Sequence, residues 1–368
     1  MKSIESQVKE KPTKELPLTA LSLVFTVALT FATLELPRIL AVIFFEAGLI
    51  DDINVIMDPE ATKAIMEIVR PIGYACLLIT LILIVLGLYT KNSKFSSLGA
   101  LFVFLPTFGY FAGTMFFLAG LGILRVAWLP FWETGIVDLG DIVYLPYMVL
   151  TYLIALLGID LAAPIMRVPG PGLITIDLRW LLAFLINGVG LFIFFLGTMA
   201  WVSGKYMRQE TVTFWIYKYS RHPQYLGYII WSYGVMLQSS LAPLSWGGEN
   251  LGVSLPWVFS SIIVICIALK EEIDMIQRDK EAYISYRTSA PFMFSIPPSL
   301  CSIIKAPFKA VFKKNQPENS KELLGTFILY SLIVVMLSSI FLILKWVPGQ
   351  MIGIWPYNVW PFNSLIVR

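Results

Sequence analysis

The sequence predicts an all-α fold, a polytopic bundle of membrane-spanning helices, from its composition and from the spacing of its apolar segments. Hydrophobic residues make up 57% of the 368 residues and charged residues only 14%, whereas soluble domains are about 45–50% apolar and about 25% charged. A helix needs about 20 mainly apolar residues to cross a bilayer. Apolar runs of that order occur at 17–45, 71–90, 97–125, 143–166, 179–202, 224–242, 253–270 and 323–346. They predict about seven to nine crossings, because two of the runs exceed one straight span.

The composition also excludes several classes of protein. Cys76, Cys266 and Cys301 lie far apart, and His222 is the only histidine, so we expect no metal site and no disulfide framework. A net charge of +3 predicts no broad basic surface and therefore no nucleic-acid partner. Any chemistry that needs an imidazole must use His222.

The N-terminal half is predicted to be a short arm followed by a helical bundle. Residues 1–16 are mixed in charge and are expected to form the arm, and residues 17–178 form a transmembrane bundle to which the sequence assigns no role. The first apolar run contains Glu35, Pro37 and Arg38. We expect the helix to break there or to end at the lipid headgroups.

Lysines and arginines in the loops predict the orientation of the C-terminal half. The segments 203–221 and 270–321 are rich in basic residues and are expected on the cytoplasmic side, whereas 243–252 has none and is expected outside. The runs 224–242 and 253–270 therefore form a hairpin whose two free ends meet at the cytoplasmic face. We expect a multi-pass integral membrane protein whose active site faces the cytoplasm.

Residues 301–322 are predicted to be a basic cytoplasmic linker, followed by a C-terminal transmembrane helix and tail over 323–368. The linker combines lysines with aromatic residues, namely Lys305, Lys309, Lys313, Lys314, Phe308 and Phe312. This combination also fits a short surface helix on anionic lipid. We favour a solvated linker, because the preference for positive charge on the inner side already accounts for the lysines.

The most informative segment of the chain ends in Arg221-His222-Pro223 and the start of the next apolar run. Proline suits the first position of a helix and disfavours helix at the preceding residue, so a helix is expected to begin at Pro223. Its first amides lack intrahelical partners and, beside Arg221, favour a carboxylate or phosphate. Gly227 lets a ligand or another helix approach the backbone closely.

Two adjacent carboxylates, Glu271 and Glu272, follow at the cytoplasmic end of the next run. Because the two runs form a hairpin, we expect these carboxylates at the depth of Arg221 and His222. The segment 271–292 has an apolar face and is expected to be an interfacial amphipathic helix that closes over the hairpin. Together these parts predict a pocket with a cationic wall and an acidic wall.

These residues resemble the isoprenylcysteine carboxyl methyltransferase and phospholipid methyltransferase superfamily. The resemblance covers roughly residues 180–300, a methyltransferase-like core over 179–300. It rests on Tyr217-x-Tyr219-x-Arg221-His222-Pro223-x-Tyr225-x-Gly227, Glu271-Glu272 and Tyr283-x-x-Tyr286. It implies that S-adenosylmethionine binds at the cytosolic end of a helical hairpin. It also implies a lipid or lipidated acceptor, with a carboxylate or an amine as the methylated group, that arrives from the bilayer.

The resemblance also implies which residues carry the activity. The implied catalytic residues are Arg221, His222 and Glu271. The implied cofactor-binding residues are Tyr219, His222, Pro223, Tyr225, Leu226, Gly227, Glu271 and Glu272. The helix N-terminus and Arg221 suit the carboxylate of the cofactor, and the two glutamates suit its ammonium or ribose hydroxyls. Methyl transfer of this kind depends mainly on positioning and desolvation.

Two other functions remain open at the level of sequence. The membrane sterol reductases, which use NADPH, carry a similar Arg-His-Pro-x-Tyr-x-Gly string, although Tyr228 after Gly227 argues against them. A transporter or non-enzymatic scaffold needs polar groups near the middle of the membrane, and few occur in the apolar runs.

Overall fold

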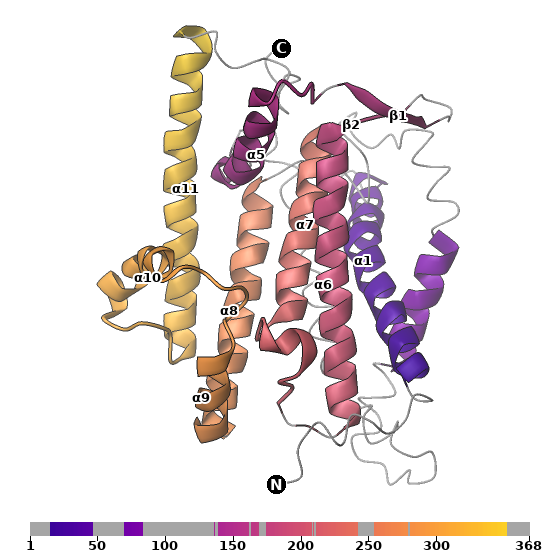
Figure 1. Cartoon of the computed structure of the whole chain (residues 1–368), viewed down its shortest axis with the longest axis vertical. Coiled ribbons are helices and arrows are strands. Elements are labelled where there is room, and N and C mark those ends of the chain that lie inside the picture. Colours follow the sequence, from indigo (N-terminus) through magenta and orange to yellow (C-terminus); the bar gives the residue numbers. More distant parts are fainter. Residues whose placement is uncertain are drawn as a thin grey trace.

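The computed structural model describes residues 15–46, 70–83, 136, 139–161, 163–168, 174–207, 209, 211–241, 254–278 and 280–351. This part of the chain is a bundle of long helices that run in roughly the same direction (Figure 1). Its α-helices are α1 (Glu15–Glu46), α5 (Leu145–Leu156), α6 (Leu178–Tyr206), α7 (Pro223–Leu241), α8 (Ser254–Arg278), α9 (Lys280–Ser289), α10 (Pro298–Phe312) and α11 (Ser320–Met351). An apolar helix over Arg70–Leu83 and the 3-10 helices η7 (Asp141–Tyr144) and η8 (Trp215–Lys218) complete the helical elements.

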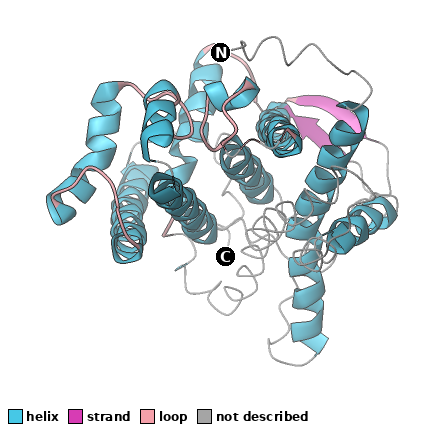
Figure 2. Ribbon diagram, turned by 90° about the horizontal axis from the view of Figure 1, so that it is seen from below, coloured by secondary structure: helices cyan, strands magenta, loops and turns pink. Residues whose placement is uncertain are grey.

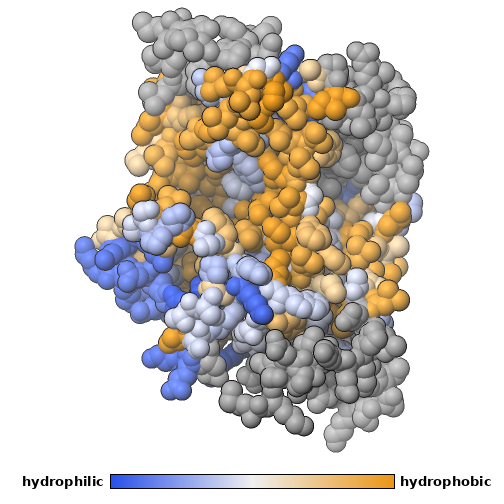
Figure 3. Space-filling model, viewed as in Figure 1, coloured by the Kyte–Doolittle hydropathy of each residue, from blue (hydrophilic) through white to orange (hydrophobic). Residues whose placement is uncertain are grey.

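Three helices of the described part are long and apolar enough to cross a membrane: α6, α8 and the segment Ser320–Ile343 of α11. Only 28%, 39% and 17% of their most apolar stretches are buried inside the protein, so most of these apolar side chains face outward. Figure 3 shows the resulting hydrophobic surface over the upper and middle part of the molecule. The predicted bundle of apolar helices is confirmed in this form, and the run 97–125 lies outside the described residues.

The run 143–166 does not form the single crossing that its hydropathy predicts. Helix α5 has 12 residues, about 18 Å of length, and a bilayer core is about 30 Å thick. Gly158 then takes a left-handed conformation, with φ of 76°, and the chain enters an antiparallel hairpin of β1 (Pro164–Val168) and β2 (Ile174–Asp177). This two-stranded hairpin lies at one end of the bundle (Figure 1) and is drawn as arrows in Figure 2; the rest of the described part is helical, so the expected all-α class holds for the bundle itself.

The expected break near Pro37 is absent, because α1 continues from Glu15 to Glu46. Glu35 is only 1% exposed and does not lie among solvated headgroups. Its Oε1 accepts hydrogen bonds from Arg70 Nε at 3.2 Å and from the Tyr74 hydroxyl at 3.0 Å. The counterion of Glu35 is therefore Arg70 on a neighbouring helix. The hydropathy of the first apolar run gave no indication of this pairing.

Helices α6 and α7 make the closest helix pair of the described part, and glycines allow their approach. A Cβ at Gly190 of α6 would overlap the backbone of Trp231, and a Cβ at Gly227 of α7 would overlap the backbone of Phe194. Small residues of this kind let membrane helices pack backbone to backbone. This packing holds the N-terminus of α7, where the distinctive sequence segment lies.

The basic segment 301–322, expected to be a solvated linker, begins as a helix. Helix α10 spans Pro298–Phe312 and ends where Lys313 takes a left-handed conformation, with φ of 58°. The expected interfacial helix over 271–292 is divided between the end of α8 and α9.

Candidate functional site

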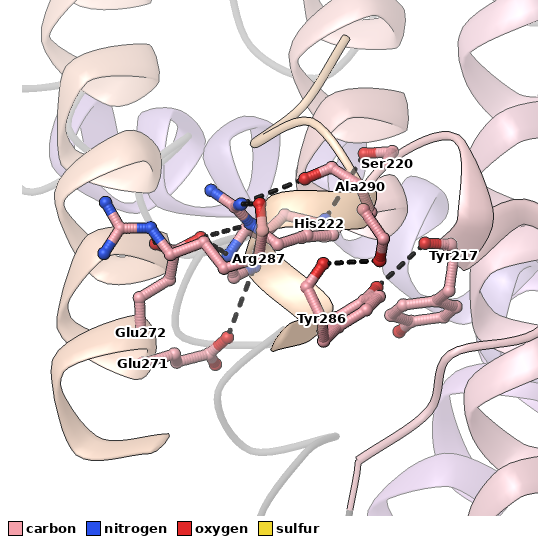
Figure 4. Close-up of polar contacts among 10 residues, drawn as sticks. Tyr217, Ser220, His222, Glu271, Glu272, Tyr286, Arg287 and Ala290 are labelled. Carbon is pink, nitrogen blue, oxygen red and sulfur yellow. Dashed lines mark hydrogen bonds and ion pairs between the residues drawn. The ribbon is translucent and has the colours of Figure 1, made fainter. Parts of the chain in front are cut away.

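The candidate site lies where the start of α7 meets the end of α8. Helix α7 begins at Pro223, as predicted, so Arg221 and His222 precede its first turn. The end of α8 brings both glutamates to the same level. His222 Nε2 lies 3.2 Å from Glu272 Oε1, and the Tyr225 hydroxyl donates to Glu271 Oε1 at 2.5 Å. Figure 4 shows His222, Glu271 and Glu272 close together, and these contacts agree with two helices whose ends meet as predicted.

Arg221 uses its donors to tie three elements together. Its Nε donates to Glu272 Oε1 at 2.8 Å, and its Nη1 donates to the carbonyl oxygens of Arg287 at 2.8 Å and Ala290 at 3.0 Å. Its backbone amide donates to the carbonyl of Pro291 at 3.0 Å. The side chain is only 8% exposed. Arg221 therefore joins the start of α7 to the end of α8 and to the carbonyl groups that end α9.

Glu272 is the centre of a charged cluster, which we call the Glu272 cluster, formed with Arg221, His222 and Arg287; all but Arg287, which is 29% exposed, are buried. Besides Arg221 and His222, it approaches Arg287, whose Nε is 3.9 Å from Glu272 Oε2. His222 is 3% exposed, and Phe292 packs edge-on against its ring with centroids 5.1 Å apart. A buried carboxylate needs such partners, because an unpaired charge away from water is very costly.

Glu271 differs from its neighbour in exposure and in partners. Its side chain is 34% exposed, against 6% for Glu272. Its Oε2 lies 3.8 Å from His222 Nδ1, and its Oε1 accepts from Tyr225, which is 4% exposed. Of the two carboxylates, Glu271 is the one that a ligand can reach.

Three buried or partly buried tyrosines, Tyr217, Tyr283 and Tyr286, lie beside the carboxylates as neutral groups. The Tyr217 hydroxyl donates to Gln224 Oε1 at 2.8 Å, and the Tyr286 hydroxyl donates to the Tyr217 carbonyl at 2.8 Å. Burial raises the pKa of the Tyr217, Tyr283 and Tyr286 phenols well above the ordinary value. The phenols therefore keep their protons: those of Tyr217 and Tyr286 act as hydrogen-bond donors, and Tyr283 is a buried packing group.

The other residues of the predicted site lie apart from the carboxylates or face other helices. Tyr219 is 75% exposed. Leu226 packs against the apolar core that includes Phe194, and Gly227 faces the backbone of α6. Pro223 is buried at the start of α7. The structure thus brings together Arg221, His222, Tyr225, Glu271 and Glu272, and it uses Gly227 for helix packing.

Sequence reasoning missed Arg287, Phe292 and the backbone carbonyls of Ala290 and Pro291. The carbonyls leave no trace in side-chain pattern, although a helix that ends before Pro291 must expose carbonyl groups at that place. Arg287 directly follows Tyr286, one of the residues that carry the resemblance, and that position was the signal available for it.

Comparison with known proteins identifies no relative of the chain. No family model matches it, and neither a curated protein nor a solved structure does. The function has to be argued from the chemistry of the site. That chemistry consists of a buried cluster whose charges are paired, and beside it one accessible carboxylate held by a tyrosine.

Proposed function

We propose that the chain is an integral-membrane methyltransferase that transfers a methyl group from S-adenosylmethionine to a lipid or lipidated acceptor at the cytoplasmic leaflet. The observation that carries the proposal is the meeting of His222, Tyr225 and Glu271 at the junction of α7 and α8, with Glu271 one-third exposed. These are the residues that the family resemblance associates with the cofactor. These residues come from separate segments of the chain and meet in the structure, which supports the resemblance independently of the sequence motif.

The donors and acceptors at the site suit this cofactor in part. The exposed carboxylate of Glu271 is an acceptor for the cofactor's ammonium or ribose hydroxyls, and the Tyr225 hydroxyl holds that carboxylate in one orientation. His222, buried beside both glutamates, fixes their separation. The cofactor supplies an electrophilic methyl group on its sulfonium, and the protein's part is to orient it and exclude water.

Arg221 has a different role from the one expected for it. Its guanidinium already serves Glu272 and two carbonyl groups, so it is poorly placed to bind the carboxylate of the cofactor. We assign Arg221 and Glu272 as positioning residues that hold α7, α8 and α9 together. Direct contact with the cofactor then falls to Glu271, Tyr225 and His222.

The membrane location belongs to the same proposal. Helices α6, α8 and α11 supply spans of sufficient length and apolarity, and three such spans fit a multi-pass protein. Glu271 follows the apolar stretch of α8 with only Lys270 between them. An acceptor dissolved in the bilayer therefore reaches the site along that helix without passing through water.

Calorimetric titration of the detergent-solubilised protein tests the proposal. Saturable binding of S-adenosylmethionine is expected for the wild type, with about 10- to 100-fold weaker binding for Glu271→Gln, the value of one hydrogen bond to a charged group. Glu318→Gln removes an exposed carboxylate that pairs with Lys314 and serves as the matched control. Absence of saturable binding in the wild type, or saturable binding of NADPH in its place, contradicts the proposal.

A further inference from the structure

Helix α10 has two exposed faces of opposite chemistry. Leu300, Ile303, Ile304 and Val311 are 48%, 66%, 45% and 59% exposed, and at 100° per residue they share one face of the helix. Lys305 and Lys309 are exposed on the opposite face, one turn apart. Isolated exposed apolar residues need no explanation, but a continuous apolar face on a basic helix indicates a surface that is not meant for water.

A third side of α10 anchors it to α11. Phe308 is 3% exposed and stacks on Phe312, with ring centroids 4.6 Å apart. Phe312 occupies the space that a side chain at Gly325 would fill, and the Tyr330 hydroxyl donates to the Ile304 carbonyl at 2.6 Å. These contacts fasten α10 to the first turns of a helix that is long and apolar enough to cross a membrane.

The position of α10 matches the boundary between the apolar and polar parts of the surface. It runs across the direction of α11 near that helix's N-terminal end (Figure 1). In the same view hydrophobic residues cover the surface above this level, and hydrophilic residues gather at and below it on the side where α10 lies (Figure 3). A helix that lies in the membrane plane at this depth would bury its apolar face among acyl chains and direct its lysines toward the headgroups.

We propose that α10 is an in-plane membrane helix that inserts its apolar face into the leaflet and binds anionic lipid headgroups through Lys305 and Lys309. Charge complementarity selects the anionic lipid, since juxtamembrane lysines attract acidic headgroups. Lys314 does not take part, because its Nζ already binds Glu318 at 2.7 Å and Glu322 at 2.9 Å. The inference rests on the membrane location proposed above and is independent of methyl transfer.

Fluorescence quenching in reconstituted vesicles tests where the two faces of α10 lie. A fluorophore is attached to Ile303→Cys on the apolar face, or to Ser302→Cys on the polar face, after Cys76, Cys266 and Cys301 are replaced by serine in the full chain. Brominated acyl chains should quench the probe at position 303, and aqueous iodide should quench the probe at position 302. Quenching of the 303 probe by iodide, or shielding of that probe from both quenchers by a second protein surface, overturns the proposal.

The same probe measures the preference for anionic lipid. Brominated phosphatidylserine should quench the 303 probe more strongly than brominated phosphatidylcholine, and Lys305→Gln should reduce this preference about fivefold, which corresponds to ~1 kcal/mol for one lysine. Lys305→Gln with Lys309→Gln should reduce it about 25-fold, whereas Lys314→Gln, the matched control, should leave it unchanged. Equal quenching by the two lipids in the wild type overturns the headgroup assignment. S-adenosylmethionine binding by these variants reports on the methyltransferase proposal separately.

Discussion

Replacing Glu272 with glutamine tests whether the buried cluster holds the ends of α7, α8 and α9 together. The substitution keeps the shape of the side chain and removes its charge. At the observed 2.8 Å between Arg221 Nε and Glu272 Oε1, the charge interaction is about 6 kcal/mol for an effective dielectric constant of about 20. Part of this is offset, because the carboxylate no longer has to be desolvated, and Arg221 keeps two carbonyl partners. We expect the free energy of unfolding to fall by about 3 kcal/mol, the lower end for breaking a buried pair.

Equilibrium unfolding of the detergent-solubilised protein by denaturant measures this change. Glu271→Gln is the matched control, because it makes the same substitution one residue earlier on a carboxylate that is 34% exposed. Solvent screening at that exposure limits its cost to about 1 kcal/mol or less. If Glu272→Gln lowers the free energy of unfolding by less than about 1 kcal/mol, or by no more than the control, the cluster does not have the structural role assigned to it.

Three further predictions concern packing, charge and pH. Gly227→Ala should destabilise the protein by about 1–3 kcal/mol, because the added methyl group overlaps the backbone of Phe194. Gly188→Ala is the control: no neighbour lies within 4 Å of the added methyl group, so it should be neutral or slightly stabilising. Thermal unfolding of both variants measures the difference. Glu35→Gln should cost about 3 kcal/mol, since it replaces the buried carboxylate that pairs with Arg70 Nε by a neutral amide, and an unchanged denaturation midpoint would refute that pairing. Burial raises the pKa of the Tyr217 and Tyr286 phenols, so above about pH 10 the folded protein retains protons that the unfolded chain releases. The free energy of unfolding should therefore fall as the pH rises above about 10. Titration of tyrosinate absorbance alongside unfolding checks the assignment.

The parts of the fold that the sequence predicted correctly depend on local rules. Pro223 begins α7 because its ring suits a first turn, and the apolar runs on either side of 243–252 form a hairpin with ends that meet. Both rules act within one or two elements, so a single sequence was sufficient to apply them.

The parts that were predicted wrongly depend on contacts between distant segments or on a balance between weak preferences. The counterion of Glu35 is Arg70, 35 positions along the chain, and no local pattern connects the two. The run 143–166 has the hydropathy of a span, but Gly158 turns the chain. The lysines after Pro298 suggested a solvated linker, but the segment begins as a helix, and Phe312 at the end of that helix packs against Gly325 of α11.

Glu271 and Glu272 show how two adjacent identical residues come to have different roles. Neighbours on a helix point about 100° apart, so when Glu272 faces Arg221 and the interior, Glu271 must face toward the rim. The sequence identified the pair but could not assign the two directions. The two substitutions should therefore have different effects. Glu271→Gln should lose most of the affinity for S-adenosylmethionine and keep nearly wild-type stability. Glu272→Gln should mainly lower the free energy of unfolding. Calorimetric titration and denaturant unfolding, run on the same two preparations, separate the roles. Equal losses of affinity and of stability in both variants would mean that the two carboxylates act as one unit, contrary to the division inferred from their exposure.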